Sequence, residues 1–127
     1  MTELVSRLAL VALGGAAGAL GRYLLVLASA RLLDGDWPLG TWLANVVGSF
    51  VIGVLASMFA LRGAPDGWRL LWIVGVLGGF TTFSSFSLET VLLIQQHQLL
   101  RAGGYVLASV AVCLCATWLG IMAGRRF

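Results

Sequence analysis

Residues 75–90 read GVLGGFTTFSSFSLET, an apolar segment with glycines in its first half and hydroxyl side chains in its second. Its glycines, Gly75, Gly78 and Gly79, precede five Ser or Thr residues within the seven positions 81–87. Adjacent glycines destabilise a helix, and Ser and Thr side chains compete for the hydrogen bonds of the helical backbone. The pattern predicts a helix that breaks around Gly78 to Ser84, and the alternative is a continuous but weak helix.

This segment belongs to one of four long apolar stretches, at about residues 5–30, 40–61, 68–95 and 102–123. Each stretch is long enough to cross a bilayer, which takes about 20 mostly apolar residues. Hydrophobic residues make up 60% of the chain and charged residues 10%, whereas roughly a quarter of a soluble domain is charged. We therefore expect an all-α, multi-pass protein of the cell membrane, in which residues 1–127 form a single domain of four transmembrane helices in the lipid bilayer.

Short polar linkers separate the four stretches, at residues 32–38, 62–67 and 95–98. Linkers of this length force neighbouring helices to run antiparallel, and they leave no room for a domain outside the membrane. Whatever the protein does, we expect it to do within the bilayer.

Several classes of function are disfavoured by the polar residues. All eight basic residues are arginines spread along the chain, whereas a nucleic-acid partner would need them clustered on one face. Cys113 and Cys115 point in nearly opposite directions on a helix, which argues against a disulfide. With His97 as the single histidine, they do not make a zinc site either. No span pairs a nucleophile with a general base, so we expect no enzymatic activity.

Polar or small side chains recur at every fourth position of two spans and so form one stripe along each helix. The stripes are Thr41, Asn45, Ser49 and Gly53 in the second span, and Tyr105, Ser109, Cys113 and Thr117 in the fourth. One interpretation is close helix–helix contact, which small and hydroxyl residues permit. The other is that both stripes line a common polar path. Asn45 favours the second, because its amide brings two donors and an acceptor into the bilayer.

Two phenylalanines, Phe83 and Phe86, lie three positions apart and share one face of their helix. Simple packing is one interpretation. However, their neighbours carry hydroxyls, and an aromatic ring is electropositive at its edge. Ring edges beside hydroxyl donors can hold a small anion without a fixed positive charge.

Arg22 lies late in the first span, where a charge is costly. One interpretation is that its side chain reaches to the membrane interface. The other is that it forms an ion pair with Glu89 of the third span.

Three segments together resemble the Fluc (CrcB) fluoride channels. They are GGAAGALGRY at 14–23, GTWLANVVGSF at 40–50 and GGFTTFSSFS at 78–87. The resemblance covers nearly the whole chain, and the third segment is the most specific. It implies a dual-topology homodimer of two antiparallel subunits, with two fluoride pores and a structural Na⁺ at the dimer centre.

The resemblance also implies roles for individual residues. The Na⁺ would be held by backbone carbonyls of Gly78 and Thr81, where the third helix breaks. The residues expected to line the fluoride pore are Asn45, Phe83, Phe86, Ser84, Tyr105, Ser109 and Thr41. Cys113 stands where a hydroxyl is expected.

The function implied is a fluoride-selective channel through which fluoride leaves the cytoplasm passively. Its pore must replace the water around the ion without binding the ion so tightly that it stays. Two alternatives remain. A small proton-coupled exporter of four helices would need a carboxylate within the membrane, for which Glu89 is the candidate. A membrane assembly subunit would transport nothing.

Overall fold

The computed structural model describes residues 1–32 and 37–126, and every regular element in these ranges is a helix. The elements are α1 (Thr2–Leu32), α2 (Leu39–Arg62), α3 (Asp66–Trp68), the π-helix η1 (Arg69–Leu77), α4 (Gly78–Phe80), α5 (Phe83–Gln95) and α6 (Leu99–Gly124). Four segments are long and apolar enough to cross a membrane, namely Thr2–Arg31, Leu39–Arg62, Asp66–Gln95 and Leu99–Gly124. The expectation of an all-α chain with four spans is confirmed for the part of the chain described.

Two of the three linkers can be followed in the structure. The chain leaves α2 through Gly63, whose φ of 62° is in the left-handed region and whose N–H bonds to the carbonyl of Phe59. It passes from α5 to α6 through His97, the one non-glycine residue with positive φ among those described, at 59°. The other linker falls largely on residues 33–36, which lie outside the described residues.

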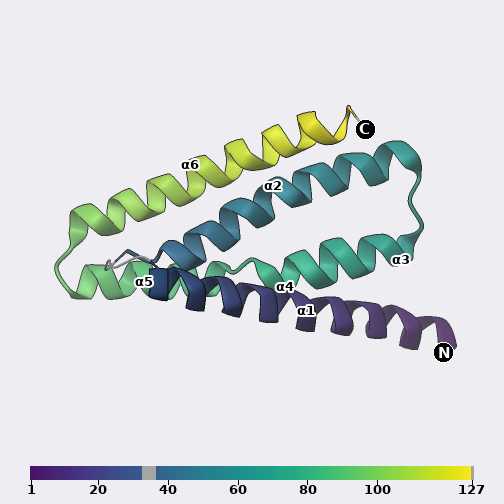
Figure 1. The fold of residues 1–127 in the computed structure, drawn as a ribbon, viewed down its shortest axis with the longest axis horizontal. Helices are drawn as coiled ribbons and strands as arrows, with labels where there is room; N and C mark the ends of the chain where they lie inside the picture. Colours follow the sequence, from purple (N-terminus) through teal and green to yellow (C-terminus); the bar gives the residue numbers. More distant parts are fainter. Residues whose placement is uncertain (33–36, 127) are drawn as a thin grey trace.

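The helices form an antiparallel bundle with both termini at the same end (Figure 1). The link from α2 to α3 lies at that end too, and the turn from α5 to α6 lies at the opposite end. The most extensive contacts are those of α2 with α6 and of α1 with η1. The bundle therefore consists of two closely packed helix pairs.

The third span changes its packing partner along its length. Its first part, η1 and α4, packs against α1, and its last part, α5, packs against α6. Between them Thr81 and Thr82 have extended backbone, with φ and ψ of −85° and 155° and of −150° and 120°. The nine-residue π-helix η1 was not anticipated from the sequence.

Glycines allow both helix pairs to pack at short distance. A Cβ atom at Gly18 of α1 would collide with the carbonyl oxygen of Val76, and one at Gly120 of α6 would collide with that of Phe50. Helix backbones approach this closely only where side chains are absent, as in many membrane helix contacts.

Candidate functional site

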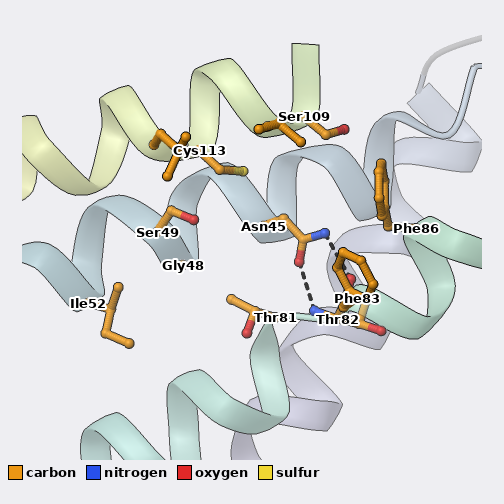
Figure 2. Close-up of a pocket in the computed structure, with 12 residues that line it drawn as sticks. Asn45, Gly48, Ser49, Ile52, Thr81, Thr82, Phe83, Phe86, Ser109 and Cys113 are labelled. Atoms are coloured by element: carbon orange, nitrogen blue, oxygen red, sulfur yellow. Dashed lines mark hydrogen bonds between the residues drawn. The ribbon is translucent and has the colours of Figure 1, made fainter. Parts of the chain in front are cut away.

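A pocket of about 370 Å³ opens between α2, α6 and the extended residues of the third span. Figure 2 shows its lining, with α6 on one side, α2 beneath it and the third span opposite. The lining residues are Asn45, Gly48, Ser49, Ile52, Thr81, Thr82, Phe83, Phe86, Ser109, Val110, Cys113 and Leu114. None of these twelve described residues carries a charge. The pocket therefore offers hydroxyls, an amide, a thiol and aromatic rings to a guest.

Asn45 on α2 holds the extended backbone in place. Its Oδ1 accepts a hydrogen bond from the N–H of Thr82 at 2.7 Å, and its Nδ2 donates to the carbonyl of Thr82 at 2.9 Å (Figure 2). The side chain thus pairs with Thr82 as a neighbouring strand would, and satisfies both backbone groups within the membrane. Because Nδ2 carries two hydrogens, one Asn45 donor is not used by this pair.

The two hydrogen bonds between Asn45 and Thr82 change which backbone carbonyls of the third span accept a hydrogen bond from the backbone. In a continuous α-helix the N–H of Thr82 would donate to the carbonyl of Gly78, but here it donates to Asn45. Likewise the N–H of Ser85, which would reach the carbonyl of Thr81, donates instead to the hydroxyl of Thr82 at 3.1 Å. The carbonyls of Gly78 and Thr81 have therefore lost their helical donors.

The hydroxyl of Thr82 caps the first turn of α5 and gathers other hydroxyls around it. It accepts from the N–H of Ser85, donates to the Ser85 hydroxyl at 3.2 Å, and lies 3.1 Å from that of Ser84. Ser and Thr are favoured at this position because their oxygen satisfies an N–H at the helix start. Their competition with the helical backbone, expected from the sequence, is visible at this residue.

The two phenylalanines have very different environments. Phe86 is 9% exposed and packs against Tyr105, with ring centroids 5.2 Å apart. Phe83 is 78% exposed, although its ring lies 5.4 Å from that of Phe86 at an angle of 47°. Both rings line the pocket, so one side of the site is formed by a ring that the described chain leaves uncovered.

Ser109 of α6 is part of the pocket wall, and its hydroxyl is buried and unsatisfied among the described residues. Its side chain lines the pocket and the residue is only 7% exposed, yet no hydrogen-bond partner for its Oγ is present among the described residues. Buried hydroxyls nearly always have a partner, so such an atom points to a bound water or ion. Cys113 lies one turn further along the same wall.

A second polar cluster lies around Glu89 of α5. The hydroxyl of Thr41 donates to its Oε1 at 2.6 Å, and that of Tyr105 donates to its Oε2 at 2.7 Å. These short, charge-assisted bonds tie α2, α5 and α6 together at one carboxylate. Since Thr41 and Tyr105 are both fully or nearly fully buried, the cluster lies inside the bundle.

The hypothesis that Arg22 pairs with Glu89 is wrong for this structure. Arg22 Nε donates instead to the carbonyl of Gly79, 3.2 Å away, across the contact of α1 with α4. That carbonyl is one that the bend of the third span deprives of a regular helical donor. Arg22 thus satisfies backbone, while the hydroxyls of Thr41 and Tyr105 satisfy the carboxylate.

The chain is similar to known proteins along most of its length. The model of the family described as "CrcB-like protein, Camphor Resistance (CrcB)" matches residues 9–121. The chain belongs to the CrcB family. The resemblance drawn from the three sequence segments is therefore confirmed. The protein is a multi-pass protein of the cell membrane.

Curated CrcB relatives that carry the name "Fluoride-specific ion channel FluC" match over nearly the full chain. The one from Caulobacter vibrioides (strain NA1000 / CB15N) is 47% identical over 124 residues, which cover 96% of this chain and 98% of the relative. The one from Phenylobacterium zucineum (strain HLK1) is 48% identical, covering 94% and 95%. The one from Agrobacterium fabrum (strain C58 / ATCC 33970) is 47% identical, covering 94% and 96%.

The predicted site residues of this CrcB chain fall into two groups. Asn45, Phe83, Phe86 and Ser109 line the pocket together with Thr81. Three others are outside the pocket lining: Thr41 and Tyr105 at Glu89, and Ser84 beside the Thr82 hydroxyl. Gly78 is likewise outside the lining and contributes to the bend through its backbone.

Sequence reasoning did not single out Thr82, which is the residue that Asn45 holds. The signal in the sequence was the position of Thr82 among the Ser and Thr residues that closely follow Gly78 and Gly79. Ser49 of the same CrcB pocket was visible as part of the stripe along the second span, four residues after Asn45.

Proposed function

We propose that this chain forms a fluoride-selective channel through which fluoride leaves the cytoplasm passively, lowering cellular fluoride. The observation that carries the proposal is the uncharged pocket in which Asn45, Ser109 and the rings of Phe83 and Phe86 meet. The name of the curated relatives supports the choice of ion.

The pocket suits a small, strongly hydrated anion. A channel must replace the water donors around the ion and yet release it. Ser109 brings a buried hydroxyl without a partner among the described residues, and Asn45 brings an amide hydrogen that Thr82 does not use. Ring edges add weak positive potential. A fixed arginine or lysine would hold the ion tightly, and none lines the described pocket.

The remaining predicted residues extend the path beyond the pocket. Tyr105 contacts Phe86 through its ring and Glu89 through its hydroxyl, and Thr41 reaches the same carboxylate. Ser84 adds an exposed hydroxyl beside Phe83 at the start of α5. In the proposed channel Ser84 donates its hydroxyl hydrogen to fluoride beyond the pocket. The hydroxyl hydrogens of Thr41 and Tyr105 would become available to the ion only on leaving Glu89.

A structural Na⁺, held by carbonyls of Gly78 and Thr81, is part of the proposal. The residues fit such an ion, because the N–H groups that would occupy these carbonyls in a helix are donated to Asn45 and to the Thr82 hydroxyl instead. Unwound carbonyls at membrane depth are suitable ligands for Na⁺. When bound, the ion would fix the geometry of the bend without being transported.

An antiparallel, dual-topology homodimer is the proposed assembly. Phe83 and Ser84 are exposed next to Thr82, in the middle of a membrane span. Polar groups at this depth are stable only against protein or water, so a second subunit is the cover that this surface requires. One pocket in each subunit gives two fluoride paths in a dimer.

The proposed function is tested by fluoride efflux from liposomes that contain the purified protein, with chloride-loaded liposomes as the control. We expect rapid fluoride efflux without any added energy source, and negligible chloride efflux. If the protein were a membrane assembly subunit without transport activity, neither fluoride nor chloride would leave the liposomes. Equal release of both ions would contradict fluoride selectivity.

A further inference from the structure

Arg22 of α1 lies against the end of the first half of the third span. Its Nε donates to the carbonyl of Gly79 at 3.2 Å, and the residue is partly buried. Along this stretch α1 contacts both η1 and α4 (Figure 1). The contact brings the positive charge of a guanidinium to the helix end that directly precedes the extended Thr81.

The charge of Arg22 has no carboxylate partner in the part of the chain that the structure describes. Carboxylate oxygens of Glu3 and Asp66 lie 2.7 and 3.9 Å from Arg7, and Glu89 accepts hydrogen bonds from two hydroxyls. A charge within a membrane span acts more strongly on its surroundings than a charge in water, because the effective dielectric constant is lower. Arg22 therefore makes the potential around the neighbouring carbonyls more positive.

The carbonyl that Arg22 occupies and the carbonyl of Gly78, which is proposed to hold Na⁺, belong to consecutive residues at one helix end. Since Gly78–Phe80 is helical, both carbonyls point along the helix axis toward its carboxyl end. Carbonyls at this end carry partial negative charge, which attracts cations. Arg22 and a bound Na⁺ would therefore share one negative helix end and repel each other.

We propose that Arg22 determines the cation specificity of this bend, because its charge weakens the binding of Na⁺ and excludes divalent cations such as Ca²⁺. The inference rests on the structural Na⁺ site of the proposed function, and not on the conduction of fluoride. Ca²⁺ also prefers oxygen ligands, so the carbonyls alone would admit it. Repulsion by one positive charge is twice as large for Ca²⁺ as for Na⁺, because the Coulomb energy is proportional to the charge of the ion.

Substitutions of Arg22 separate its charge from its hydrogen bond. Arg22→Gln removes the charge and keeps a donor in place, because Nε of arginine and Nε2 of glutamine are both attached to Cδ. Arg22→Lys keeps the charge. Arg7→Gln is the matched control on the same helix, since Arg7 is exposed near the start of α1 and bonds to Glu3 there.

Cation binding is measured as the rise in unfolding temperature in a neutral detergent. NaCl or CaCl₂ replaces N-methylglucamine chloride at constant ionic strength. We expect Na⁺, but not Ca²⁺, to stabilise the original chain, Arg22→Lys and Arg7→Gln. In Arg22→Gln the Na⁺ concentration for half-maximal stabilisation should fall about tenfold, and Ca²⁺ should now stabilise the protein too. A merely structural role of Arg22 would instead weaken the binding of both ions in this variant.

Equal or weaker binding of Na⁺ in Arg22→Gln, or tighter binding in Arg22→Lys, would overturn the proposal. If Arg22→Gln did not fold, the original chain would decide, because stabilisation by Ca²⁺ as strong as that by Na⁺ would contradict the exclusion of divalent ions. If Na⁺ stabilised none of the four proteins, the cation site and this inference would both fail.

Fluoride efflux from liposomes is measured separately on the original chain. A chain that Na⁺ stabilises but that releases no fluoride would refute the proposed channel and leave the role of Arg22 intact. The two failures are therefore distinguishable.

Discussion

Asn45 pairs with the backbone of Thr82 through two hydrogen bonds, of 2.7 and 2.9 Å, and thereby holds the third span in extended conformation at this residue. One side chain of α2 thus replaces the backbone acceptor that a continuous helix would supply to the N–H of Thr82. The same pair redirects the N–H of Thr82 away from the carbonyl of Gly78. Several features of the candidate site depend on this single contact.

Replacing Asn45 by Asp is expected to abolish most fluoride efflux. A carboxylate oxygen would face the carbonyl of Thr82 in place of a donor, and an unsatisfied buried polar group costs about 1–3 kcal/mol. Efflux from liposomes and thermal unfolding in detergent measure the two effects. Ser57→Ala is the matched control on α2, because the Ser57 hydroxyl bonds within its own helix to Val54. Normal efflux from Asn45→Asp would show that the pair is dispensable.

Replacing either Phe83 or Phe86 by Ile is expected to slow fluoride efflux, because both rings line the pocket. The two variants should differ in stability. Phe86 is 9% exposed within its own subunit, so its replacement should lower the free energy of unfolding of the subunit by about 1–3 kcal/mol. Phe83 is 78% exposed within one subunit, so its replacement should act mainly on the contact with the proposed second subunit. Phe50→Ile, at an exposed position of α2, is the control. Unchanged efflux in both variants would remove the rings from the proposed path.

Replacing Glu89 by Gln separates a channel from a proton-coupled exporter. For a channel we expect fluoride efflux to continue without a pH gradient, at a reduced rate, because the amide cannot accept from both Thr41 and Tyr105 as the carboxylate does. Efflux is measured with and without a pH gradient across the liposome membrane. Glu3→Gln, at the exposed start of α1, is the matched control. Efflux that requires a pH gradient in the original chain and vanishes in Glu89→Gln would favour the exporter.

Removing Na⁺ is expected to stop fluoride efflux if the carbonyls of Gly78 and Thr81 hold a structural ion. The protein would be purified and reconstituted with N-methylglucamine in place of Na⁺, and Na⁺ would then be added back. Recovery after addition of Na⁺ is the expected result, because carbonyls freed from helical hydrogen bonds at membrane depth suit this ion. Full activity throughout in the absence of Na⁺ would exclude a structural requirement.

Replacing Gly18 by Ala is expected to destabilise the protein, because the added Cβ would collide with the carbonyl oxygen of Val76. Overpacking of this kind typically costs about 1–3 kcal/mol. Gly15→Ala is the matched control on the same helix, since a Cβ there would have no neighbour within 4 Å. Thermal unfolding in detergent compares the two variants. If Gly18→Ala and Gly15→Ala unfolded at the same midpoint temperature, the contact between α1 and η1 would accommodate the added Cβ at little cost, against this prediction.

Sequence patterns located much of the candidate site. Asn45, Phe83, Phe86 and Ser109 were all singled out, and all line the pocket. Thr41 and Tyr105 were placed on polar stripes, but their partner was not foreseen: both donate to Glu89. A polar stripe in the sequence predicts which face of its helix a residue occupies. It does not predict which residue of another helix lies opposite that face.

Two other features of the structure, the π-helix η1 and the partner of Arg22, have no local signal in the amino-acid sequence. Apart from Arg69, the π-helix η1 consists of apolar residues and glycine, and it contacts α1 closely at Gly14 and Gly75. One of the two interpretations of Arg22, an ion pair with Glu89, was wrong. In the folded chain Arg22 lies against α4, where the carbonyl of Gly79 is within reach.

The amino-acid sequence by itself determined the number of spans and the composition of the pocket wall. Lipid imposes a minimum apolar length on every crossing, and glycines followed by hydroxyls weaken a helix wherever they occur. Only the tertiary structure decided which groups bond to one another: Asn45 to Thr82, Arg22 to Gly79, and Glu89 to Thr41 and Tyr105. The reason is physical, since a hydrogen bond needs its two atoms within about 3 Å, and that distance is set by how the helices pack and rotate against one another.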